Sequence, residues 1–174
     1  FSLSVNSASH VGDVFAKAAA LSQTSVQGMT EAMKTASVVG EQYGASMEDV
    51  ATALTLLAKV NITGTAAGTS LRNMLKELYS PTAGAAAAFK QLGLATSDAD
   101  GKLKSFPTII YELRTVLEKF DKASQVNILQ KLFGERGAKE AVSMLSLTRE
   151  KWDELNGSIA QSSGFMREVA SQLE

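Results

Sequence analysis

Carboxylates are the residues of this sequence best suited to chemistry, because it contains one histidine, His10, and no cysteine. A serine or cysteine nucleophile needs a neighbouring base, and no such arrangement can be argued around His10. The lack of cysteine also excludes a disulfide framework and a thiolate zinc site. We therefore interpret His10 as a surface residue near the start of the chain.

Two groups of acids could form a site. Asp98, Asp100 and Gly101 faintly resemble a calcium-binding loop, but no glutamate follows at the required offset. We interpret this segment as a plain turn. Glu48 and Asp49 form an adjacent acid pair, but acids in the first turn of a helix commonly interact with the helix dipole. The sequence therefore predicts no metal ligand.

The remaining candidate acids are expected on exposed faces of the predicted helices, where they alternate with lysine and arginine: Glu112, Glu118, Glu135 and Glu140. Some muramidases act through a lone glutamate on a helix, so a cell-wall hydrolase-associated domain stays an alternative. The usual companions of such an acid, an aromatic sugar cleft and a second carboxylate, are not visible in the sequence. The segment Phe133–Gly137 lacks the lysine and the spacing of a phosphate loop. We predict no catalytic residue and no cofactor.

The composition limits the classes of partner. The chain has 174 residues and a net charge of −1, with 17 basic and 18 acidic residues. It therefore lacks the basic surface expected of a protein that binds nucleic acid sequence-specifically. No apolar run approaches the ~18 residues of a membrane span, and no signal peptide is visible. Because the chain begins with Phe1, we expect a piece of a longer protein or a processed product.

Helical periodicity positions these residues. Apolar side chains recur at three- and four-residue steps, alanine is abundant, and the chain has two prolines and 6% aromatic residues. The sequence predicts an all-α fold, a compact array of about nine short helices, with a tail or loop at 1–10 and one helical domain at 11–174. The expected helices cover approximately residues 10–21, 26–42, 47–61, 65–79, 81–92, 105–120, 121–133, 135–147, 148–159 and 165–174. Residues 94–104 are expected to form a turn or a short hairpin.

The stretch Asn61–Pro81 lies at the centre of this prediction. From its first residue onward, the stretch is predicted to form a tight connection, then a helix start with small side chains, and then an apolar helix end. A glycine inside a helix, such as Gly68, costs about 1 kcal/mol relative to alanine. We expect this cost to be offset by another backbone lying close to the face that carries Gly64 and Gly68.

Glycines four residues apart occur twice, in Gly40–Gly44 and in Gly64–Gly68. In lipid this spacing pairs helices, but the polar flanks favour close packing in a protein core. A contact between copies of the protein, giving a homo-oligomer, is the alternative. The candidates for close packing or an interface are Gly40, Gly44, Gly64, Ala67, Gly68 and Leu71.

Several motifs, in order, resemble the core region of phage tail tape measure proteins. The strongest run is Asp49–Ala58, Ile62–Gly64, Ala67–Arg72 and Leu78–Pro81. Matching segments continue on both sides: Asp13–Lys17 with Ser22 and Ser25, Leu92–Leu94, Asp100–Lys102, Leu132–Gly134, Ala138–Leu147, and Gly164 with Met166 and Ala170. The resemblance covers about residues 11–170. It departs from the family at Val60–Asn61, where a small Ala-Gly pair is usual, which affects the expected shape of the local turn.

The resemblance implies a structural protein, not an enzyme. Tape measure proteins are long, mostly helical chains that lie in the tail tube and set tail length. Their expected partners are the tail tube, tail-tip or baseplate proteins and tail assembly chaperones, with host membrane contact only during ejection. The resemblance places such a protein in the phage tail of the virion, and in the host cytoplasm during assembly. A helical interaction module unrelated to phage is the second alternative.

Overall fold

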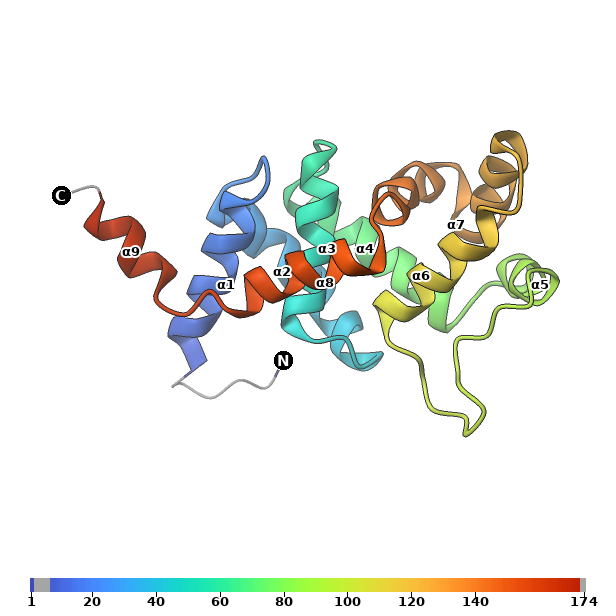
Figure 1. Cartoon of the computed structure of the whole chain (residues 1–174), viewed down its shortest axis with the longest axis horizontal. Helices are drawn as coiled ribbons and strands as arrows, with labels where there is room; N and C mark the ends of the chain where they lie inside the picture. The colour runs from blue at the N-terminus through green and yellow to red at the C-terminus, as the bar shows by residue number, and fades with distance from the viewer. Residues whose placement is uncertain (2–6, 173–174) are drawn as a thin grey trace.

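The computed structural model describes residues 1 and 7–172, which contain nine α-helices and no strand (Figure 1). The predicted all-α fold is confirmed. The first helix already begins at Ala8, inside the segment predicted as a tail, and residues 2–6 lie outside the described part. The helices are α1 (Ala8–Ala20), α2 (Val26–Gln42), α3 (Met47–Lys59), α4 (Gly64–Tyr79), α5 (Ala83–Gln91), α6 (Phe106–Leu117), α7 (Lys122–Leu145), α8 (Arg149–Ala160) and α9 (Phe165–Ser171).

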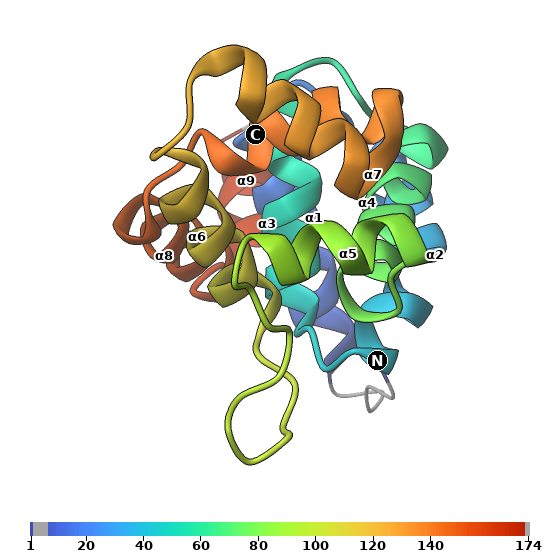
Figure 2. The ribbon, with the colours of Figure 1, turned by 90° about the vertical axis from the view of Figure 1, so that its right-hand side faces the viewer.

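Helix α3 is the centre of the fold. It packs against α1, α2, α4, α7 and α8, and it lies in the middle of the molecule in both ribbon views (Figures 1 and 2). Every residue from Val50 to Ala58 is buried, as expected of a helix with apolar or small side chains all round. Its two internal hydroxyls bond to the helix itself: Thr52 donates to Glu48 O at 2.7 Å and Thr55 to Ala51 O at 2.9 Å.

The predicted tight connection between α3 and α4 is confirmed. Asn61 has a φ of +62° and Gly64 a φ of +57°, the left-handed region that glycine and asparagine tolerate best. The asparagine of the atypical Val60–Asn61 pair therefore suits the turn that it forms. No single helix among the described residues is long and apolar enough to cross a bilayer. Helices α3 and α4 taken together are long and apolar enough, but they are bent by 120° relative to each other.

Most of the nine described helices begin with a side-chain cap. Ser46 and Asp49 form a capping box, in which Ser46 Oγ accepts from Asp49 N at 3.0 Å. Such a box satisfies backbone N–H groups that have no partner within the helix. Side-chain oxygens at Ser105, Asp121 and Thr148 likewise accept the N–H three residues later.

The predicted start of α5 is wrong. The sequence predicted a helix that begins at Pro81, but the cap is Thr82 and the helix begins at Ala83. Thr82 Oγ1 accepts from Ala85 N at 3.4 Å, and Glu77 Oε2 accepts from both the N–H and the hydroxyl of Thr82. These bonds hold the chain outside the helix for two more residues.

The segment between α5 and α6 projects from the helices (Figure 2). Its turn is confirmed: Asp98 Oδ1 accepts from the N–H groups of Asp100 at 3.0 Å and Lys102 at 2.9 Å. One antiparallel bridge joins Ser97 to Leu103. The predicted hairpin is therefore reduced to a single bridge, and the Asp98 side chain orders the turn.

Helix α7 runs from Lys122 to Leu145 but is interrupted by a kink in the backbone. Gly134 has φ 73° and ψ 174°, which is not helical. The sequence predicted that one helix ends at this glycine and that the next then begins. The structure shows a kink at this position instead. Glycine is required there because residues with a side chain rarely adopt that conformation.

Candidate functional site

The α2–α4 crossing is where the two helix backbones come closest. A Cβ built on Gly68 would collide with the carbonyl oxygen of Ala32 and lie 2.7 Å from Thr35 Cβ. The obstacle is partly backbone, which cannot rotate away as a flexible side chain can. The small residue at position 68 therefore permits the approach of α2.

Other candidates from the sequence lie around this crossing. Ala67 and Leu71 are each 1% exposed and belong to the core. Gly64 does not share in the backbone contact, because a Cβ there would meet only Glu31 Oε2, at 3.4 Å. Its positive φ accounts for the glycine instead.

In the second glycine pair, likewise, only one member, Gly40, lies at a close helix contact. A Cβ on Gly40 would lie 2.8 Å from Val50 Cγ2, so α2 also approaches α3 closely. At Gly44 a Cβ would meet no atom within 4 Å, which corrects the close-packing interpretation for this residue. Gly44 follows the end of α2 with a φ of +76°, as is common for a helix-terminating glycine. A role for these glycines between copies of the protein stays a prediction.

The candidate chemical residues of α1 and α3 make structural contacts. His10 Nε2 lies 3.1 Å from Glu48 Oε1, so this histidine joins two helices and is partly buried. Asp49 Oδ1 accepts from Asn156 Nδ2 at 3.1 Å, which links α3 to α8. Burial raises the pKa of Asp49. Both acids are therefore engaged within the protein.

Three of the four helix-face glutamates pair with cations. Glu112 lies 2.8 Å from Lys104, Glu118 lies 3.0 Å from Arg114, and Glu140 lies 3.2 Å from Arg136. Glu135 is exposed. Within the described part of the chain, no group of three or more His, Asp or Glu residues is placed to hold a metal ion.

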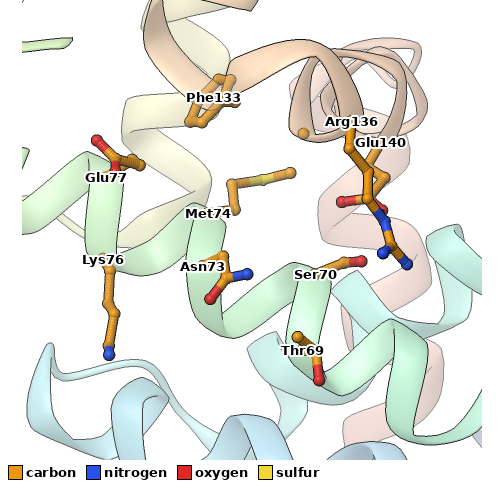
Figure 3. A pocket seen from close by; sticks show the side chains of 10 residues that line it. Thr69, Ser70, Asn73, Met74, Lys76, Glu77, Phe133, Arg136 and Glu140 are labelled. Atoms are coloured by element: carbon orange, nitrogen blue, oxygen red, sulfur yellow. The ribbon is translucent and has the colours of Figure 1, made fainter. Parts of the chain in front are cut away.

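A hollow of about 300 Å³ lies between α4 and α7 (Figure 3). One wall is apolar, from Met74 and Phe133. The polar lining includes Ser70 and Asn73 on α4 and Glu140 on α7. The expected exposed position of Glu140 is wrong, because its side chain is 5% exposed. Periodicity alone does not show which glutamate a neighbouring helix covers.

A carboxylate that the sequence did not indicate as a site residue lies at the α1–α9 contact. Asp13 is 4% exposed, and its oxygens accept from Gly164 N at 2.8 Å and Met166 N at 2.9 Å. The bond from Met166, then that from Gly164, holds the pKa of Asp13 below its usual value. No sequence signal could have found this, because the partners are about 150 residues away.

Comparisons with known proteins agree on one family. The family model described as phage-related minor tail protein matches residues 1–134. The tape measure protein of Pneumococcus phage Dp-1 is 30% identical over 174 residues, all of this chain and 15% of that relative. The probable tape measure protein of Escherichia phage P2 is 32% identical over 177 residues, all of this chain and 22% of that relative. The chain thus spans less than a quarter of either relative. No solved structure matches it.

Proposed function

The chain belongs to the phage-related minor tail protein family, and we propose that it serves as a folded structural domain of a tail tape measure protein in tail assembly and length determination. The match of the family model over residues 1–134 carries the proposal. The closely packed helices support it, because a passive building block needs a stable core and no reaction centre.

The domain would act as a fixed element, not as the ruler. Measuring length requires a long chain, and this one spans 15% and 22% of its two relatives. A folded domain of this size is roughly 30 Å or more across, which is difficult to fit in a narrow tube together with other chains. We propose that it sits at the tail tip or baseplate, or unfolds for transit and rearranges on ejection.

The partners would be the proteins present at that position. We propose contacts with the tail tube, with tail-tip or baseplate proteins and with tail assembly chaperones, in the virion and earlier in the host cytoplasm. Contact with the host membrane would occur only during ejection.

Deleting the domain in frame from the full tape measure gene tests its place in the tail. An extended helix of 174 residues would span about 260 Å at 1.5 Å per residue. If the domain is a folded anchor, electron microscopy should show failed assembly, or tails that are not shortened by this length. Tails shortened by about 260 Å would contradict the anchor and indicate an extended segment of the ruler.

Hydrogen exchange on intact tails gives an independent test. Protected amides in α2, α3 and α4 are expected if the domain stays folded at one end of the tail. Uniformly fast exchange across these helices would contradict a folded domain in the assembled particle.

A further inference from the structure

The hollow between α4 and α7 contains two buried polar side chains that the fold leaves incompletely bonded. Ser70 is 5% exposed and makes no side-chain hydrogen bond within the described residues. Glu140 is also 5% exposed, and one of its oxygens accepts from Arg136 Nε at 3.2 Å. Its other oxygen has no partner among the residues described. Neither oxygen is among the enclosed polar atoms without a partner, which in the described part of the chain belong to Arg72, Arg114 and Ser162. Both oxygens are therefore open to a ligand in the hollow.

Arg136 is a weak partner for a buried carboxylate. Its side chain is 78% exposed and reaches Glu140 across one helical turn, and pairs in water gain little because solvent screens them. A second hollow, about 440 Å³ in volume and lined by Asn61 and Lys139, borders the same ion pair. Arg136 therefore has space to turn aside when another cation approaches Glu140.

The acceptors between Ser70 and Glu140 suit a primary ammonium, although the lining also includes Lys76, Glu77 and Arg136. The Glu140 carboxylate and Ser70 Oγ can both accept hydrogen bonds, and an ammonium has three donors. In Figure 3 the Ser70 hydroxyl faces the side of the hollow where Glu140 lies, whereas the Lys76 ammonium extends away from it. The apolar wall of Met74 matches the methylene stem of a lysine, which commonly packs on apolar surface.

We propose that this hollow binds the side chain of a lysine presented by a second polypeptide. The neighbouring hollow extends the site along α4 and accommodates residues that flank the lysine. Tail assembly is not needed for this binding, so the isolated 174-residue chain can test it separately from the proposed function.

Calorimetric titration at low salt, with three probes, tests the proposal. The probes are a blocked hexapeptide with one lysine, the same peptide with norleucine in place of lysine, and n-butylamine. The lysine peptide should bind at least about 10-fold more tightly than the norleucine peptide, because norleucine has no charged donor for the open oxygen of Glu140. Equal binding of both peptides, or no binding, would overturn the proposal. Binding of butylamine as tight as that of the lysine peptide would overturn the polypeptide part.

Three variants locate the binding. Glu140→Gln should weaken binding of the lysine peptide about 10-fold, since it removes the negative charge and keeps the shape of the side chain. Arg136→Gln should strengthen binding of the lysine peptide, because it removes the competing cation. Weaker binding by this variant would contradict the proposed competition for Glu140. The control Glu135→Gln changes an exposed acid on the same helix and should leave binding unchanged. If Glu140→Gln fails to fold, Ser70→Ala replaces it, with a loss of about 3-fold expected and no loss contradicting the site.

Discussion

The α2–α4 crossing and the α1–α9 contact are held by opposite means. At the crossing, backbone lies against backbone at Gly68, and Leu71 is enclosed. Helix α9 has no buried residue and lies at one end of the molecule (Figure 1). It is joined to α1 by two hydrogen bonds to Asp13 and by Lys17 Nζ, which lies 4.7 Å from the ring centre of Phe165.

The difference indicates which parts of the domain open first. Dispersion and apolar burial at the crossing respond little to pH, and their loss unfolds the core. A contact made through one carboxylate and one cation depends on pH and salt. Helix α9 should therefore open locally at a lower free energy than the rest of the domain.

Truncating Leu71 should have the largest effect. Leu71→Ala is expected to lower the free energy of unfolding by about 2–5 kcal/mol, because it leaves a cavity in a closely packed core. Urea denaturation measures this loss. The control Val38→Ala, at a side chain that is 70% exposed, should change stability by less than about 0.5 kcal/mol. Similar losses in both variants would mean that the crossing is not specially packed.

Adding one methyl group at the crossing should come next. Gly68→Ala is expected to destabilise by about 1–3 kcal/mol, because the methyl meets the Ala32 carbonyl and the backbone must shift. Helix propensity alone predicts a gain of about 1 kcal/mol. Gly157→Ala should show that gain, since a Cβ there meets nothing within 4 Å. A higher melting temperature for Gly68→Ala would contradict the backbone contact.

Removing the Asp13 charge should release α9 and leave the core folded. Asp13→Asn is expected to cost about 1–2 kcal/mol, because the amide has one accepting oxygen and so leaves one of the two backbone N–H groups without its partner. Hydrogen exchange at pH 7 should be faster in α9 and unchanged in α3. Faster exchange throughout both helices would mean that Asp13 supports the whole fold.

The Asp13 contact also predicts how the stability of the α1–α9 contact changes with pH. Its pKa is lowered in the folded state by the two backbone N–H groups, with smaller contributions from Arg167 and His10. The stabilisation is therefore complete above the unfolded pKa of about 3.9 and is lost as the pH falls through the folded pKa. The stability difference between the wild type and Asp13→Asn should shrink as the pH falls below about 4. A constant difference would contradict the carboxylate's role.

The smallest effect is expected at Lys17. Lys17→Gln should lose about 0.5–1 kcal/mol of local α9 stability, because the cation no longer lies over the Phe165 ring. Exchange rates in α9 measure this change. Lys34→Gln, at an exposed lysine on α2, should have no effect on α9, and an equal effect would point to net charge as the cause.

Local rules predicted most element boundaries because caps act over three or four residues. Ser46, Ser105, Asp121 and Thr148 bond to the N–H three positions later, so residue type and spacing suffice. Thr82 was missed because Glu77, in the preceding helix, holds its N–H and hydroxyl outside α5. Periodicity did not show that α3 is buried on every side, because this burial results from contacts with five other helices.

The sequence by itself determined the helices, the turns and the family, because periodicity, capping and ordered motifs lie in neighbouring residues. It also indicated that Gly68 needed compensation for its cost in a helix. Only the tertiary structure decided that Gly68 meets a backbone and Gly44 does not, and that Glu140 is buried while Glu135 is exposed. These outcomes depend on which segments, far apart in the chain, come to lie side by side, and that choice is a property of the whole packing arrangement.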